Sequence, residues 1–297
     1  MRAAERGFLL LSSHLGDPER KPLTAPQLRS LARRILDANR PEPDRELEEA
    51  DLIALGYGHE MAARIVNLLA QEHLLHEYLK RAGEWGCMPL TRVSDGYPLL
   101  LRRRLGQDSP GSLWAKGDIS LLTQPAVSLV GSRDLHEPNR DFAREVGRQA
   151  ALQGYVLVSG NARGADRTAQ ESCLKAGGRV ISVVADELQK QPQRENMLYI
   201  SEDGFCEPFS AQRALSRNRV VHALGLKTFV AQSSLKTGGT WDGTVKNLRS
   251  RWSDVFCFHD GSEAMTLLEQ MGANPIGIQE LASFYDLQTS EESLFDR

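Results

Sequence analysis

A short polar motif that can bind a phosphate follows an apolar run near the middle of the chain. The run Ala126–Val130 is typical of a buried strand, and the tripeptide Gly131-Ser132-Arg133 comes directly after it. A glycine permits close backbone approach, and an arginine presents a planar fork of donors that matches a phosphate. A tight turn with a solvated arginine explains the same residues, so this motif indicates a phosphate site only in combination with other motifs.

A glycine-rich loop after the apolar run Tyr155–Ser159 is the second candidate. Its candidate residues are Ser159, Gly160, Arg163, Gly164 and Asp166. Backbone N–H groups in such a loop and the start of the next helix form an anion site, to which Arg163 adds charge. Asp166 is equally explained as a helix cap and as a carboxylate that holds Arg163 or Arg133 in place. The loop has neither a G-x-G-x-x-G pattern nor a Walker lysine, so it does not indicate an NAD or ATP site.

Two further polar segments lie toward the C-terminus. One contains Arg213, Arg217, Asn218 and Arg219, and the other, a glycine-rich turn, contains Lys236, Thr237, Gly238 and Thr240. Arginines within one or two helical turns suit phosphate contacts, and an asparagine can read a base edge or cap a helix. A solvated basic face would explain the arginines if they stood alone. Trp241, which follows the turn, is expected to pack in the core.

The segments around these loops alternate between apolar runs and helical patterns. Strands are expected at Ala126–Val130, Tyr155–Ser159, Arg179–Val184, Thr228–Ala231 and Val255–Phe258, with helices from about 139 to 153 and from 165 to before 177. This alternation predicts an α/β fold with a Rossmann-like parallel sheet flanked by helices. Ligands of such sheets bind outside the carboxyl ends of the strands, so Arg133, Arg163 and the Arg217–Arg219 segment are expected to converge there.

The rest of the chain reads as helical. Residues 1–85 are expected to form a small N-terminal helical domain, with a capping box at Thr24 and Gln27 and a loop at Pro41–Glu48. Residues 86–265 are expected to form the Rossmann-like domain. Residues 266–297 are expected to form a short helical C-terminal tail.

The composition excludes several classes of protein. Hydrophobic residues make up 41% of the 297 residues and charged residues 25%, which is typical of a globular chain. The net charge of −3 means that any nucleic-acid site is a local basic patch. The four cysteines are far apart, and no cluster has metal-ligand spacing, so neither disulfides nor a metal are expected. Without a long apolar run or a leader pattern, the chain is expected to be cytoplasmic with no membrane partner.

Five motifs in this order resemble the DprA (Smf) DNA-processing family. They are Tyr97-Pro98 with Leu100, Leu113–Gly117, Val130–Arg133, Val158–Asp166 and Arg217–Arg219. The resemblance implies an extended Rossmann-like fold that binds single-stranded DNA and forms homodimers. It also implies a role in loading the recombinase RecA onto DNA taken up in natural transformation. By position, the residues that match the family's DNA-pocket motifs are Arg133, Arg163, Asn218 and Arg219, with looser identity at Lys236–Thr240.

The chain departs from the family pattern in two places. Thr237–Thr240 stands where the family usually has a serine-glycine-serine-leucine loop, and too few residues follow His259 for the winged-helix domain that many members carry. Two alternatives stay open, both compatible with a phage-defence or toxin–antidote role: a nucleotide-sensing module, and a relative of the nucleoside-monophosphate phosphoribohydrolases. The second needs a glutamate that Gly238–Gly243 lacks, although Asp242 lies there. The sequence therefore predicts a single-stranded DNA-binding protein that is not an enzyme and needs no cofactor.

Overall fold

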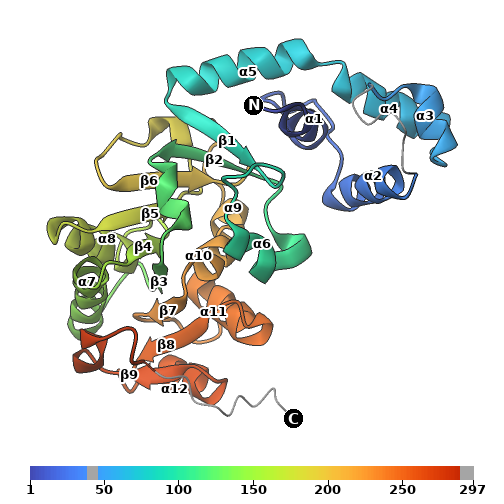
Figure 1. Ribbon diagram of the computed structural model, residues 1–297. Coiled ribbons are helices and arrows are strands. Elements are labelled where there is room, and N and C mark those ends of the chain that lie inside the picture. The colour runs from blue at the N-terminus through green and yellow to red at the C-terminus, as the bar shows by residue number, and fades with distance from the viewer. Residues whose placement is uncertain (39–45, 288–297) are drawn as a thin grey trace.

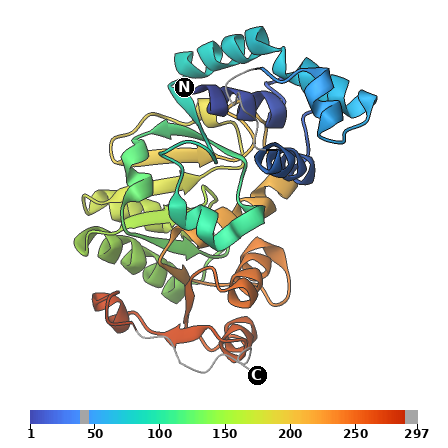
Figure 2. The same ribbon diagram turned by 45° about the vertical axis from the view of Figure 1, so that its right-hand side comes forward.

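The computed structural model describes residues 1–38 and 46–287 (Figures 1 and 2). Most of the expected loop at 41–48 and the last part of the expected tail therefore lie outside the described residues. The described N-terminal part contains the helices α1 (Ala3–Ser12), α2 (Ala25–Asp37), α3 (Glu49–Ala54), α4 (His59–Leu69) and α5 (Glu72–Glu84). The predicted capping box is confirmed at the start of α2, where the Thr24 N–H donates to Gln27 Oε1 at 2.9 Å.

Two hydrophobic cores hold the N-terminal helices. A small core lies among the helices themselves and consists of Leu23, Leu31, Leu52, Ala62, Ile65 and Leu68. Helices α1 and α5 also contribute Leu9, Leu10, Leu75 and Tyr78 to the large core that surrounds the sheet. The helical part is therefore packed onto the sheet through α1 and α5, next to β1 (Cys87–Thr91), as Figure 1 shows.

The predicted α/β fold is confirmed. Nine strands of the described residues form one sheet in the order β1-β2-β6-β5-β4-β3-β7-β8-β9. After β1 they are β2 (Ser112–Gly117), β3 (Ala126–Val130), β4 (Val156–Ser159), β5 (Arg179–Val183), β6 (Met197–Ser201), β7 (Lys227–Val230), β8 (Asp254–Phe258) and β9 (Asn274–Ile276). The pairs from β6 to β9 are parallel, and β1 and β2 add an antiparallel edge. The strand order changes direction between β3 and β7, which makes this position the topological switch point.

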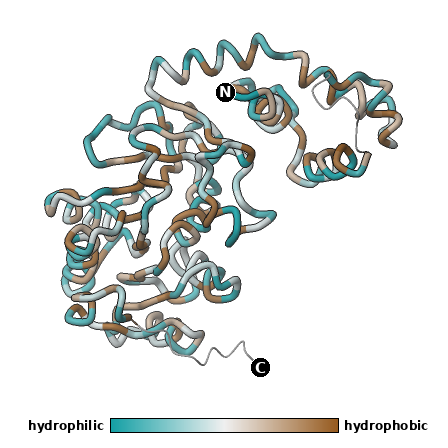
Figure 3. The backbone as a smooth tube through the Cα atoms, viewed as in Figure 1, coloured by the Kyte–Doolittle hydropathy of each residue, from teal (hydrophilic) through white to brown (hydrophobic). Residues whose placement is uncertain are grey.

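Helices cover both faces of the sheet, as Figures 1 and 2 show. The helices α7 (Glu137–Leu152) and α8 (Ala165–Lys175) pack against each other and against β3 and β4. On the opposite face, α10 (Asn218–Leu224) packs against β3 and β4 and α11 (Gly238–Ser250) packs against β8, and α6 (Leu99–Leu105) and α9 (Ala211–Ser216) pack against α10. Short 3-10 helices are η1 (Gly106–Asp108), η2 (Ile119–Thr123), η3 (Leu188–Lys190) and η4 (Gln279–Ala282). Figure 3 shows hydrophobic residues along the central strands, where every residue of β3 and β4 is buried.

The C-terminal segment differs from the expected helical tail. Helix α12 (Glu263–Gln270) is followed by β9, which extends the sheet beside β8. Leu281 and Phe284 are buried in the main core, so this segment is packed against the sheet rather than being a separate tail. Trp241 is buried, as expected, and Cys87, Cys173 and Cys257 are free and buried. Within the two described stretches, no helix is long and apolar enough to cross a bilayer.

Candidate nucleic-acid interface

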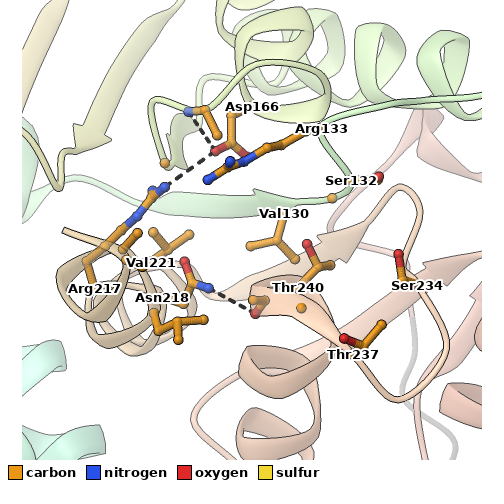
Figure 4. Close-up of a pocket in the computed structure, with 18 of the residues that line it drawn as sticks. Val130, Ser132, Arg133, Asp166, Arg217, Asn218, Val221, Ser234, Thr237 and Thr240 are labelled. Atoms are coloured by element: carbon orange, nitrogen blue, oxygen red, sulfur yellow. Dashed lines mark hydrogen bonds and ion pairs between the residues drawn. The ribbon is translucent and has the colours of Figure 1, made fainter. Parts of the chain in front are cut away.

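A pocket of about 520 Å³ opens at the switch point of the sheet, beside the carboxyl ends of β3 and β7. This volume is within the usual range for a site that holds a small ligand or one unit of a polymer. Figure 4 shows residues from several loops around it. Its lining consists of Val130, Gly131, Ser132, Arg133, Gly160, Ala162, Asp166, Phe209, Ala211, Ala214, Leu215, Arg217, Asn218, Val221, Ser234, Thr237, Gly238, Gly239 and Thr240.

Backbone hydrogen bonds on both sides of Ser132 fix the loop after β3. The Ser132 N–H donates to Gln232 O at 2.9 Å, and the Ala165 N–H donates to Ser132 O at 3.1 Å. A Cβ at Gly131 would lie 2.5 Å from the Cβ of Ala165, so this glycine is needed for α8 to begin against β3. The loop is thus a rigid support for the next residue, Arg133.

Arg133 carries a free positive charge into the pocket. Its side chain is exposed and makes no hydrogen bond or ion pair with any of the described residues. It also lines an adjoining hollow of about 280 Å³, which Arg163 lines as well. A guanidinium without an internal partner is available for an external anion, to which it can donate two parallel hydrogen bonds.

Arg217 reaches the same pocket from the opposite side but is buried. Its Nη1 donates to Val183 O at 2.9 Å, its Nη2 lies 3.9 Å from Asp166 Oδ2, and its buried Nε has no partner. A Cβ at Gly160 would overlap this guanidinium, so a glycine there gives Arg217 its place. Arg217 therefore contributes a largely buried positive charge to the pocket wall.

Asp166 is placed between the two guanidinium groups, as Figure 4 shows. Gly164, with φ +80°, is the N-cap of α8, and the Asp166 carboxylate accepts from the Ala162 N–H at 3.2 Å. Burial raises the pKa of Asp166, and the Arg217 guanidinium, the Ala162 N–H and Arg133 act in the opposite direction. Asp166 is therefore the counter-charge of Arg217. Its contacts are not those of a helix cap, and it does not hold Arg163.

The glycine-rich turn is held against the start of α10. The Asn218 Nδ2 donates to Gly239 O at 2.9 Å, which fixes the first turn of α11 at the pocket. Thr237, the N-cap of α11, makes no side-chain bond to this turn. The positive end of a helix of 13 residues therefore faces the cavity, where it favours an anion.

The remaining predicted residues lie around or below the pocket. Ser159 is buried under the loop and accepts from Gln170 Nε2 at 2.7 Å. Arg163 is on the surface, with its side chain 72% exposed, and lies 3.7 Å from the exposed Asp134. Lys236 is exposed, has φ +52°, and is outside the pocket lining.

The structure does not bring Arg213 and Arg219 into the pocket. Arg213 Nε donates to Asp203 at 2.8 Å, and its Nη1 donates to the Ala185, Glu207 and Pro208 carbonyls. Arg219 pairs with the buried Glu202 at 2.5 Å; burial raises the pKa of Glu202 to about 7 despite this pair. Both arginines make their hydrogen bonds and ion pairs within the protein, so of the four residues predicted in this segment Arg217 and Asn218 line the cavity and Arg213 and Arg219 do not.

Sequence reasoning missed Phe209, whose ring lines the pocket and is 59% exposed. It lies in the segment after β6, and recognising that strand would have marked this segment as a strand-end loop. Asp242, the carboxylate considered for glycosidic chemistry, is exposed on α11 and outside the lining. No cluster of three or more metal-binding side chains is found among the described residues.

Curated relatives support the resemblance noted from the motifs. The DNA processing protein DprA of Bacillus subtilis is 28% identical over 166 residues, which are 52% of this chain and 55% of that protein. DprA of Streptococcus pneumoniae is 30% identical over 159 residues, which are 50% of this chain and 55% of that protein. The chain thus spans about half the length of these relatives.

Solved structures share the fold. The X-ray structure of DprA from Streptococcus pneumoniae superposes with a TM-score of 0.66 and 23% identity, covering 90% of this chain and 99% of that one. DNA processing protein A from Helicobacter pylori, whose structure concerns its single-stranded DNA binding mode, superposes with a TM-score of 0.55 and 24% identity, covering 66% and 94%. The sequence model described as DNA recombination-mediator protein A matches residues 89–276, more than half of the chain, and this protein therefore belongs to that family.

Proposed function

We propose that this protein binds single-stranded DNA in the pocket at the switch point, with phosphates against Arg133, Arg217 and the first turn of α11. The observation that carries the proposal is that Arg133, whose exposed side chain makes no hydrogen bond or ion pair with the described residues, lines one cavity with Arg217 and the first turn of α11. Two arginines and a helix N-terminus directed at one cavity favour a phosphate over a neutral ligand. The study of single-stranded DNA binding by the Helicobacter pylori relative supports the same ligand.

The rim of the pocket favours a single strand over a duplex. Phe209 presents an exposed ring beside the positively charged cavity. An unpaired base can stack on such a ring, whereas the bases of a duplex are already stacked inside it. Because every base has a flat face, this contact gives little sequence preference.

The wider role that we propose rests on family membership. The protein leaves the DNA chemically unchanged, acts as a homodimer, and delivers the strand to a RecA-type recombinase in DNA processing during natural transformation. No sequence feature or pocket contact described above identifies these partners, so membership of the DNA recombination-mediator family is their support.

The first prediction concerns the ligand. Labelled oligothymidylate should bind more tightly than a blunt duplex, and the logarithm of its affinity should fall with the logarithm of salt concentration with a slope of about −2 for three phosphate contacts. Fluorescence anisotropy over a salt series measures both, and gel analysis shows whether the strand is recovered intact. Equal affinity for the duplex, a salt-independent affinity, or binding of free nucleotides alone would contradict the proposal.

The second prediction concerns Arg163, which lines the hollow next to Arg133. We expect Arg163→Ala to weaken single-strand binding about 3- to 5-fold and to reduce the salt slope by about 0.7, as the loss of one exposed phosphate contact does. Arg163→Lys should recover part of the affinity, because lysine keeps the charge but not the fork. Thermal unfolding should be unchanged, since within the described stretches the side chain makes an ion pair only with the exposed Asp134. A lowered melting temperature with unchanged affinity would show a structural role instead.

A further inference from the structure

A second basic groove lies away from the pocket, between the N-terminal helices and the sheet domain. It has a volume of about 670 Å³ and is lined by Arg29, Ser30, Arg33, Arg34, Asp37 and Gln107. The first five residues belong to α2 and Gln107 belongs to η1. None of the six side chains is apolar, and three of them are arginines.

Two of these arginines are available to a ligand. Arg29 is exposed and has no hydrogen-bond or ion-pair partner among the described residues. Arg33 is 85% exposed and lies 3.7 Å from Asp37, which is itself exposed, so this pair is weak in water. Arg34 is different, because its Nη1 donates to Leu55 O at 2.6 Å and its guanidinium stacks on Tyr57.

Arg29 and Arg33 form a pair that suits an extended phosphate chain. Four residues apart on a helix, they share one face with about 6 Å between their Cβ atoms. Ser30 and Gln107 add neutral hydrogen-bonding groups to the same groove. A protein partner would need apolar or aromatic anchors in its docking surface, and this lining supplies none.

A short connection joins the groove to the pocket. Asn218 lines the pocket, and the next residue, Arg219, donates through Nε to Asp108 O at 3.1 Å. Gln107, the neighbour of Asp108, lines the groove. Helix α6, which leads into η1, also packs on α10, and Figures 1 and 2 show α2 on this side of the molecule. The two basic surfaces are therefore neighbours across η1 and the start of α10.

We propose that Arg29 and Arg33 bind the phosphates of the same single strand where it leaves the pocket. The N-terminal helices then extend the DNA site, and the strand runs from Arg133 past η1 to α2. This inference rests on the proposed function of the pocket. It differs from that function in predicting a contact that only a strand longer than the pocket can make.

Strand length separates the two contacts in the test. We compare the wild-type protein with the double variant Arg29→Ala/Arg33→Ala on oligothymidylates of about 5 and about 20 nucleotides. The double variant should bind the longer strand about tenfold more weakly, with the salt slope reduced by about 1.4 for two lost phosphate contacts. Its affinity for the shorter strand should match that of the wild type. The matched control is Arg144→Ala/Arg148→Ala, which removes two exposed arginines at the same spacing from α7 on the other face of the sheet.

The outcomes distinguish this inference from the proposed function. If the wild-type protein binds neither strand, the proposed function fails and this inference fails with it. If the wild type binds both and the α2 variant is unchanged on the longer strand, only the extended site is overturned. Equal weakening on both lengths, or the same loss in the α7 control, also overturns it, because either result indicates a general charge effect rather than a contact.

Discussion

Replacing Arg133 with alanine should reduce the affinity for single-stranded DNA roughly 10- to 100-fold. A hydrogen bond to a charged group contributes about 1.5–3 kcal/mol, and about 1.4 kcal/mol corresponds to a tenfold change in affinity. The melting temperature should stay at the wild-type value, because Arg133 is exposed and bonds to none of the described residues. Anisotropy titrations and a thermal melt of the same preparation measure the two quantities.

A matched control for this variant is Arg249→Ala. Arg249 is exposed in the last turn of α11, at the end of that helix away from the pocket. The Arg249→Ala variant should lower the affinity only through the change in net charge of the protein, and by much less than Arg133→Ala does. Comparable losses in both variants, or a destabilised Arg133→Ala protein, would remove Arg133 from the site.

The centre of the fold could be predicted because its strands are continuous apolar runs. The five strands expected from such runs correspond to β3, β4, β5, β7 and β8, with ends that differ by one residue at most. The strands β1, β2 and β9 lack this signal, whereas β6 (Met197–Ser201) carries it and was not predicted. β1 and β9 each contain a proline, which edge strands tolerate, and β2 contains Lys116, whose buried ammonium group donates to Gln189 O at 2.8 Å. Such strands are stabilised by their neighbours and carry no clear local pattern.

The loops of the site could be predicted, but whether each arginine is free or paired within the protein could not. Gly131, Ser132, Arg133, Asp166, Asn218 and the glycine-rich turn line one pocket at the strand ends of the parallel sheet, whereas Arg163 and Arg219 lie outside it. Whether an arginine is free depends on partners that are distant in the chain. Arg219 pairs with Glu202, 17 residues before it, whereas Arg133 forms no ion pair with any carboxylate in the described part of the chain. Only the folded arrangement distinguishes these two arginines.

The largest effect on stability is expected at Asp166. Asp166→Ala should lower the free energy of unfolding by about 3 kcal/mol, because it leaves the Arg217 guanidinium buried without its counter-charge. The Ala162 N–H also loses its acceptor. DNA binding should weaken as well, since Arg217 is then no longer held at the pocket wall. Urea unfolding and anisotropy measure these two effects separately.

The conservative variant Asp166→Asn tests the electrostatic part of this argument. It keeps an acceptor for the Ala162 N–H and removes only the charge, so at neutral pH it should be more stable than Asp166→Ala. Because burial raises the pKa of Asp166 above its usual 3.8, the folded protein holds this proton more tightly than the unfolded chain. The wild type should therefore lose stability relative to the Asn variant as the pH rises from about 3.8 through the folded-state pKa.

A helix variant nearby provides the control for both Asp166 substitutions. Glu171 lies exposed on the same helix, so Glu171→Ala removes one negative charge from α8 without uncovering a buried partner. Its stability and its pH profile should remain those of the wild type. If Asp166→Ala unfolds at the same urea concentration as Glu171→Ala, then Asp166 does not hold Arg217. In that case the buried arginine is maintained by its bond to Val183 O alone.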